Sequence, residues 1–270
     1  MSIIKAEGII LRSMKMGETS KLLTLFTREH GILKVIAKGS RSRKSRFGGT
    51  LETLTVIHFV YYHKDSRDLQ LLSAADIVET FPTLSSDLEK WGYANACGEL
   101  IIRAHPAAEA TPKLYPILLD SLRAINTAPP GSEARAGFWS LQMKLLSVFG
   151  VAPNPRRCLQ CETAFNIPAR HTVHFHIARG GFFCETCANG AGAPPRGAGS
   201  LPLTAEVIVL LGNLQSLPAA KLMQTIISAE AGRSVERFFQ TYFHAHLEEI
   251  GKLQALEFVR EVIGATSARD

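Results

Sequence analysis

The residues best suited to chemistry are four cysteines arranged as two C-x-x-C pairs. Cys158 and Cys161 form the first pair, and Cys184 and Cys187 form the second after an interval of 22 residues. Zn²⁺ favours four tetrahedral ligands, and thiolates are among its preferred donors. A gap of two residues lets one tight turn aim both sulfurs inward, so each pair supplies half of the shell. The spacing therefore predicts one structural zinc ion.

Other uses of these cysteines are less well supported. Four thiolates leave no open position for water or substrate, so the metal should be structural and not catalytic. An iron–sulfur cluster accepts the same ligands, and spacing alone does not separate it from zinc. Three histidines lie between the pairs, but the thiolates already complete the shell. One of His171, His174 and His176 could replace a cysteine as a ligand. We instead expect His174 and His176 on one face of a strand, pointing to solvent, in a hairpin that turns at Gly180-Gly181.

Six cations are concentrated within residues 34–46, a segment that contains no Asp or Glu. Without them, the other 24 basic residues equal the 24 acidic residues, so this segment carries the whole net charge of +6. Cations that neutralise nucleic-acid phosphates release counterions, which gives salt-dependent binding without sequence preference. The segment therefore predicts a nucleic-acid contact, with a solvated charge run as the alternative. The six residues are Lys34, Lys38, Arg41, Arg43, Lys44 and Arg46.

Aromatic residues in and after this segment have two readings. Phe47, Phe59, Tyr61 and Tyr62 could stack on unpaired bases, or they could pack inside the domain. Core packing is the favoured reading for the individual rings. The fifth cysteine, Cys97, is expected to be a small core residue of a helix.

Residues 1–80 consist of five short runs rich in β-branched and aromatic residues, separated by glycines or charges. Such runs are typical of strands. Five strands in so short a segment favour a closed barrel, because closure removes exposed edges. We expect an OB-type barrel, with an SH3-like barrel as the alternative. The runs are IIKAEGIILRSM, SKLLTLFTR, GILKVIAKG, LTVIHFVYYH and DLQLLSAADIVET.

The rest of the chain is mainly helical in pattern. Residues 81–155 predict the first part of a helical domain, with Ser85 or Ser86 as the first cap, a break at Pro106 and Pro112, and Gly150 as a C-cap. Residues 156–190 form the cysteine module, followed by a Gly/Ala/Pro stretch at 190–200. Residues 200–265 predict the second helical part, with helices over 203–229, 233–249 and 254–263. The whole is a multi-domain α+β protein.

Composition and motifs narrow the function classes. With 46% hydrophobic residues the chain can form real cores, and no segment has the apolar length of a membrane helix. The N-terminus lacks the pattern of a secretory signal. In a reducing cytoplasm, two C-x-x-C pairs indicate metal binding and not disulfides. We therefore expect a cytoplasmic protein. Phosphate-loop, G-x-S-x-G and H-E-x-x-H motifs are absent, so we do not expect an enzyme.

The order of these features resembles the bacterial DNA repair protein RecO family of recombination mediators. The resemblance spans nearly the whole chain. It is carried by GIIL (8–11), GETS (17–20), AKGSR (37–41), GVAP (150–153), the two cysteine pairs with Gly180-Gly181, and RFFQTYFHAHL (237–247).

This resemblance implies an OB fold followed by a helical domain with an inserted zinc module. It also implies binding of single- and double-stranded DNA, annealing of complementary strands and loading of recombinase onto coated single strands. The implied partners are RecR, the tail of single-strand-binding protein, and RecF. Two alternatives stay open from the residues themselves: a zinc-ribbon adaptor that binds protein or RNA, and a zinc enzyme, which the closed ligand set disfavours.

Overall fold

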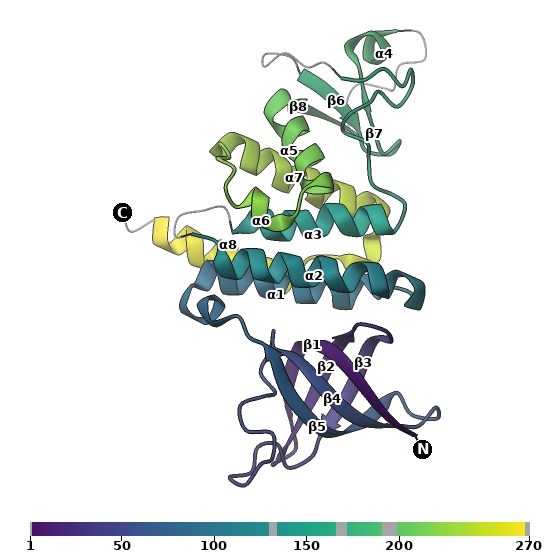
Figure 1. Ribbon diagram of the computed structural model, residues 1–270. Coiled ribbons are helices and arrows are strands. Elements are labelled where there is room, and N and C mark those ends of the chain that lie inside the picture. Colours follow the sequence, from purple (N-terminus) through teal and green to yellow (C-terminus); the bar gives the residue numbers. More distant parts are fainter. Residues whose placement is uncertain (1, 130–133, 166–171, 191–198, 268–270) are drawn as a thin grey trace. The chain divides into compact units, whose positions relative to one another are not determined.

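The computed structural model describes residues 2–129, 134–165, 172–190 and 199–267. They form two compact units (Figure 1). The first comprises residues 1–127 and 253–270, and the second comprises residues 128–252. His171, part of the expected loop at 128–131 and most of the 190–200 stretch lie outside the described residues. Within the described ranges, no helix has both the length and the apolar character needed to cross a membrane.

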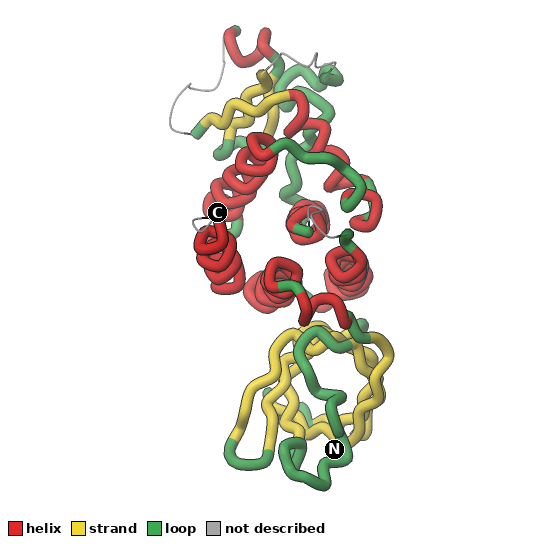
Figure 2. Tube along the Cα trace, turned by 90° about the vertical axis from the view of Figure 1, so that its left-hand side faces the viewer, coloured by secondary structure: helices red, strands yellow, loops and turns green. Residues whose placement is uncertain are grey.

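Five strands form the N-terminal sheet, as predicted. They pair in the closed order β1-β2-β3-β5-β4, and Figure 2 shows them as a ring. β3 and β5 run parallel, while the other neighbouring pairs are antiparallel. The strands are β1 (Ser2–Met16), β2 (Ser20–Thr27), β3 (Gly31–Ala37), β4 (Val56–His63) and β5 (Leu69–Glu79).

The interior of this sheet is filled by alternate residues of the strands, because successive side chains point to opposite faces. Phe59 and Tyr61 are both buried there, and their rings stack with centroids 5.6 Å apart. The segment between β3 and β4 adds Phe47 and Leu51 to the same core. Phe47, Phe59 and Tyr61 are therefore core residues, as the sequence favours, and Tyr62 is half-buried.

Three helices complete the first unit: α1 (Leu88–Ala104), α2 (Thr111–Thr127) and α8 (Gln254–Ser267). The predicted cap of α1 was wrong. Ser85 and Ser86 lie in a short 3₁₀ helix, η1 (Pro82–Ser86), and the Asp87 carboxylate instead accepts the N–H groups of Glu89 and Lys90. The helices break between Ala104 and Thr111, so Pro106 lies in the expected break and Pro112 lies just after it. Proline is tolerated in the first turn of a helix, and Pro112 lies there in α2, which follows η2 (Ala108–Ala110).

α8 packs on α1 at a glycine. A β-carbon at Gly92 would overlap the side chain of Val259, which is buried. We expect Gly92→Ala to destabilise the first unit by about 1–3 kcal/mol, because overpacking forces the two helices apart. Urea unfolding measures the change.

A second substitution tests the cause of that loss. Val259→Ala removes the clashing methyl groups, so the double variant should recover part of the stability that Gly92→Ala removes. If the double variant instead loses as much stability as the two single variants together, the contact is not the cause of the loss.

The second unit combines a small sheet with helices. The strands pair antiparallel in the order β7-β6-β8. Residues 203–229 do not form the single helix predicted. Strand β8 (Ser200–Thr204) covers their start, and helix α5 (Ala205–Ser216) ends before Pro218, because a proline ring clashes with the preceding turn of a helix. The elements are α3 (Arg135–Val148), β6 (Thr172–His176), β7 (Gly181–Phe183), α4 (Glu185–Asn189), β8 (Ser200–Thr204), α5 (Ala205–Ser216), α6 (Ala219–Leu222), α7 (Ala229–His246) and η3 (Glu248–Ile250).

An aromatic cluster joins this sheet to α7. Phe175 on β6 and Phe182 on β7 have ring centroids 4.8 Å apart, and Phe175 lies 4.9 Å from Phe238 of α7. All three rings are fully buried. The strand pair that leads to the second cysteine pair is therefore packed against a helix by apolar contacts.

Polar contacts reinforce this attachment. The Tyr242 hydroxyl donates to the Val151 carbonyl over 2.6 Å, just before the first cysteine pair. Nε2 of His246 lies 2.8 Å from the Ile177 carbonyl, in the turn between β6 and β7. Both side chains belong to α7, so one helix anchors the entry to the module and its hairpin.

Candidate metal centre and nucleic-acid interface

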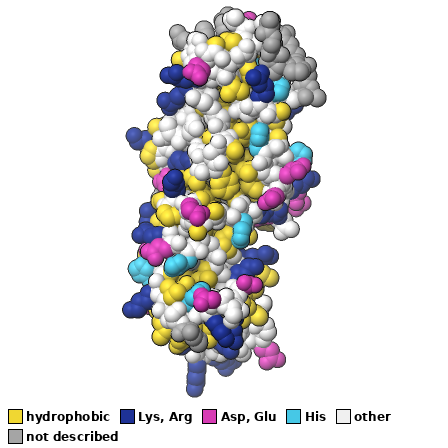
Figure 3. Space-filling model, turned by 90° about the vertical axis from the view of Figure 1, so that its right-hand side faces the viewer, with side chains coloured by type: hydrophobic (Ala, Val, Ile, Leu, Met, Phe, Trp, Pro, Cys, Tyr) yellow, Lys and Arg dark blue, Asp and Glu magenta, His cyan; other side chains and the backbone are white. Residues whose placement is uncertain are grey.

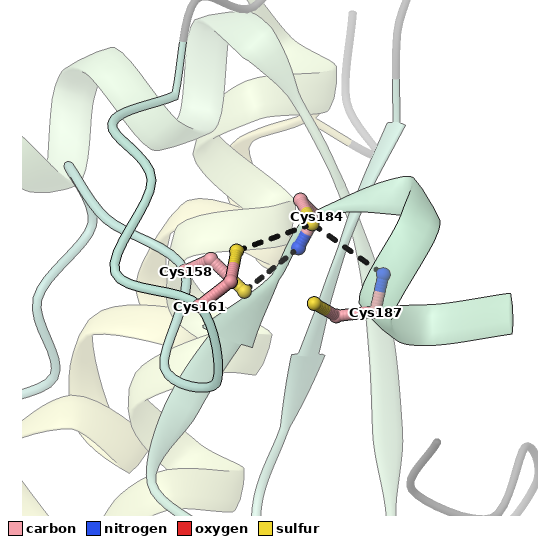
Figure 4. Close-up of side chains that lie close together, drawn as sticks. All are labelled: Cys158, Cys161, Cys184 and Cys187. Atoms are coloured by element: carbon pink, nitrogen blue, oxygen red, sulfur yellow. Dashed lines mark hydrogen bonds between the residues drawn. The ribbon is translucent and has the colours of Figure 1, made fainter. Parts of the chain in front are cut away.

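The four cysteines meet at one point, as their spacing predicts. Cys158 and Cys161 lie on a turn after α3, and Cys184 and Cys187 lie at the start of α4 (Figure 4). Their four sulfurs all lie within 4.8 Å of one another, and the sulfurs of Cys161 and Cys184 are 3.8 Å apart. Tetrahedral ligands about 2.3 Å from one ion are separated by about 3.8 Å. The cluster is therefore compatible with one metal ion.

Backbone amides already point at the sulfurs. The N–H of Cys184 donates to Sγ of Cys158, and the N–H of Cys187 donates to Sγ of Cys184, each over 3.4 Å (Figure 4). Such bonds favour the thiolate over the thiol. Burial opposes ionisation of Cys158, but its bonds from the backbone outweigh this and lower its pKa.

The cluster without a cation distributes its protons unevenly. Hydrogen bonding from Thr163, whose hydroxyl lies 3.3 Å from Cys161 Sγ, lowers the pKa of Cys161 to about 6. The hydrogen bond with Cys184, followed by burial, raises the pKa of Cys187 to about 12. Four thiolates this close repel one another, so a divalent cation among them would be needed to ionise all four.

The local fold of the module depends on a glycine turn. Gly180 has a φ of 62° between β6 and β7, a conformation that glycine adopts without steric cost. The side chain of Leu159 lies against Gly181, where a β-carbon would overlap it, and the Leu159 N–H donates to the Phe182 carbonyl over 2.7 Å. The first cysteine turn is thus held directly on the hairpin that leads to the second.

The other candidate ligands lie elsewhere. His174 and His176 are half-buried on β6, and Nδ1 of His176 accepts the Arg179 N–H over 3.3 Å. Neither belongs to the cysteine cluster. Cys97 is fully buried in α1, and burial raises its pKa far above the ordinary value, as expected for a core thiol.

The six predicted nucleic-acid contacts are all exposed. Lys34 lies on β3, Lys38 directly follows that strand, and the other four lie on the segment that leads to β4. Within the described residues, none of the six takes part in an ion pair. Lys and Arg side chains project in dark blue from the foot of Figure 3, where the barrel lies.

The basic segment is a series of turns attached to the barrel. Phe47 is buried in the barrel core, and the guanidinium of Arg46 lies over its ring at 5.0 Å. Arg41 binds the turn between β1 and β2. Its guanidinium donates to the carbonyls of Gly17 and Glu18 over 3.2 and 2.9 Å. The backbone N–H of Arg41 donates to the Thr19 carbonyl over 2.8 Å. Among the described residues, Arg41 is therefore the one of the six whose side chain forms hydrogen bonds within the protein, whereas Arg46 contacts a ring.

We expect Arg41→Lys to loosen the basic segment although it preserves the charge. An ammonium group cannot reproduce the planar guanidinium fork. Loss of about 1 kcal/mol of hydrogen bonding should speed amide exchange in residues 38–46 by roughly fivefold. Hydrogen exchange with mass spectrometry measures this, with Arg43→Lys as the matched control. Equal exchange rates in the two variants would contradict the role.

Sequence reasoning missed the anchors on α7. Tyr242 and His246 lie in RFFQTYFHAHL, one of the segments that carry the family resemblance. Their four-residue spacing places both on one helical face, and this signal was available. Thr163 carried no comparable signal, because its contact with Cys161 depends on the shape of the turn.

Comparison with known proteins decides the family. The family description "Recombination protein O N terminal" matches residues 1–81, and "Recombination protein O C terminal" matches residues 85–255. The chain belongs to the RecO family. Three proteins named "DNA repair protein RecO" illustrate the similarity. The Bacillus pumilus protein is 26% identical over 97% of this chain and 98% of its own length. The Pelotomaculum thermopropionicum protein is 30% identical over 92% and 91%, and the Shouchella clausii protein 30% over 96% and 94%.

Membership of the RecO family confirms the resemblance inferred from the motifs. It supports a role in DNA repair and recombination, with DNA and recombination proteins as the general class of partner. RecO is a recombination mediator and not a catalytic enzyme family, so the chain is not assigned an enzymatic reaction.

Proposed function

We propose that this protein binds single- and double-stranded DNA, anneals complementary strands and helps to load recombinase onto coated single strands. The observation that carries the proposal is the group of six exposed cations at residues 34–46. They account for the whole net charge and have no acidic partner among the described residues. Two strands can pair only when their phosphate repulsion is screened, and a concentrated basic surface supplies that screening.

An OB-type barrel is the architecture that we propose for the DNA-binding unit. The closed order β1-β2-β3-β5-β4, with β3 parallel to β5, supports this assignment. The proposed organisation is a barrel over residues 1–80, helical parts over 81–155 and 200–265, and a cysteine module over 156–190. In such barrels the loops between strands contact nucleic acid, and the basic segment is a loop of this kind.

Zinc is the metal that we propose for the cysteine cluster. Four thiolates at tetrahedral spacing suit this ion, and its role would be to stabilise the module. Cys158, Cys161, Cys184 and Cys187 would hold it. Binding would release the proton that Cys187 retains, so affinity should fall as the pH falls.

The partners that we propose are RecR, the tail of single-strand-binding protein, and RecF. Family membership supports recombination proteins as a class. We also propose that the protein acts in the cytoplasm, at the nucleoid during repair.

A titration tests this function. Fluorescent single strands are titrated with the protein at several salt concentrations, and the complementary strand is then added. We expect affinity to fall steeply with salt and the strands to anneal faster than without protein. Preference for a structured RNA with no annealing would instead support a zinc-ribbon adaptor.

A further inference from the structure

One cysteine of the metal cluster is open to solvent. Cys161 is exposed, whereas Cys158 is buried and both Cys184 and Cys187 are half-buried. The sulfur of Cys161 faces the sulfur of Cys184, 3.8 Å away, across the gap between the two pairs (Figure 4). A small dissolved oxidant therefore has access to one ligand, and that ligand already lies against a sulfur of the other pair.

The two sulfurs are close enough to become bonded after a small movement. A disulfide joins sulfurs about 2.05 Å apart, so these atoms need to approach by about 1.8 Å. Residues 159–164, the turn that carries Cys161, are all exposed, so little packing opposes a shift of this size. Cys184 is held more firmly, between the buried Phe183 of β7 and the first turn of α4. The exposed turn is therefore the part that moves.

Hydrogen peroxide supplies the chemistry for such a bond. The thiolate of Cys161 attacks one oxygen of the peroxide, which breaks the O–O bond, forms a sulfenic acid and releases hydroxide. The thiolate of Cys184 then attacks the oxidised sulfur, forms the S–S bond and expels a second hydroxide. Two protons convert both hydroxides into water. Together the two sulfurs have given two electrons to the peroxide.

We propose that Cys161 and Cys184 are a peroxide-sensitive pair, whose conversion into a disulfide opens the metal site. Metals bind thiolates, so the disulfide removes two of the four ligands and the ion leaves. The new bond still joins the first cysteine turn to α4, and the contact of Phe175 with Phe238 still holds the hairpin on α7. Reduction by a thiol restores both ligands, which makes the change reversible. This inference rests on the zinc site proposed above and adds its regulation by oxidation.

Cys97 provides an internal reference for this reaction. It is fully buried in α1, and it belongs to the first unit, whereas the four ligands belong to the second. Access of the oxidant governs which thiols react, so Cys97 should keep its thiol while the exposed ligand is oxidised.

Controlled oxidation of the zinc-loaded protein tests the inference. The protein receives one equivalent of hydrogen peroxide, and a chromogenic chelator measures the zinc that is released. Remaining thiols are then blocked, and peptide mass spectrometry locates the disulfide. We expect zinc release together with a disulfide between Cys161 and Cys184, a free thiol at Cys97, and recovery of bound zinc after a thiol reductant and zinc are added.

Two histidine variants identify the pair, because histidine binds zinc but cannot form a disulfide. Cys161→His should keep its zinc and lose it to peroxide roughly tenfold more slowly than the unaltered protein. Cys187→His, the matched control, should still form the disulfide between Cys161 and Cys184.

The possible outcomes separate this inference from the metal site itself. A disulfide within one C-x-x-C pair, or oxidation that leaves zinc bound, overturns the inference. Equal rates of zinc release from the unaltered protein and from Cys161→His overturn it as well. Absence of zinc from the unaltered protein would overturn the proposed metal site, and the disulfide map would still decide whether the two cysteines pair. If a histidine variant does not bind zinc, the disulfide map of the unaltered protein decides.

Discussion

Replacing Cys158 with serine should unfold the cysteine module and leave the barrel folded. Cys158 is the most buried of the four ligands, and its sulfur accepts the Cys184 N–H. Metal binding at structural cysteine sites contributes roughly 10 kcal/mol to folding, more than the aromatic contacts to α7 can replace. Bound metal, measured by mass spectrometry, should fall from one ion per chain to none. Hydrogen exchange should rise over residues 158–188 and stay unchanged over residues 2–79.

His174→Ala is the control for this prediction. His174 lies on β6 near the cluster but outside it, so its loss should leave the metal content unchanged. Chelation of the unaltered protein should reproduce the effect of Cys158→Ser. Added zinc should restore the chelated protein but not the Cys158→Ser variant. One tightly bound zinc ion in the Cys158→Ser variant would refute a four-cysteine site.

Chelation also tests how the functions are divided. We expect the metal-free protein to retain its affinity for single strands, because the proposed contacts lie in the other unit. A loss of DNA binding with the barrel intact would show that the module itself contacts DNA.

Reversing charge at Arg43 and Lys44 should weaken DNA binding by about 100-fold at moderate salt. The two side chains are exposed, and each contact with a phosphate adds about 0.7–0.9 to the salt slope. Arg43→Glu with Lys44→Glu should therefore lower the slope by about 1.5. Fluorescence anisotropy over a range of salt concentrations measures both quantities. Arg41 is left unchanged because its guanidinium binds the turn between β1 and β2.

The matched control separates local contacts from net charge. Lys113→Glu with Lys221→Glu changes the total charge equally, at two exposed positions outside the basic segment. It should reduce affinity much less and leave the slope nearly unchanged. Equal losses in the two double variants would mean that the proposed site is wrong and that only the overall field matters.

The metal cluster was the easiest feature to predict, because metal ligation depends on residue types and short spacings. Strand number was also predictable, since strand patterns repeat over a few residues. The cap of α1 was harder. Ser85, Ser86 and Asp87 are all good caps, and only the formation of a 3₁₀ helix at Pro82–Ser86 selects Asp87.

Features that depend on distant contacts were not predictable. Core packing was the favoured reading for Phe47, but nothing in the charged segment after Lys38 indicated that Leu51 also fills the barrel core. The pattern of the last helix shows an apolar face but not which helix covers it. The closeness of Gly92 to Val259 identifies that helix as α1, more than 150 residues earlier in the chain.

The pairing of α8 with α1 has a consequence for the order of synthesis. The second unit, residues 128–252, is inserted within the first, whose final helix is made last. A ribosome therefore exposes the barrel, α1 and α2 long before α8 exists, and the surface of α1 at Gly92 that Val259 later covers stays uncovered during that interval. Growing chains should depend on chaperones at this stage, because unpaired apolar surface promotes aggregation. Completion of the DNA-binding unit thus waits for the complete cysteine module to be translated.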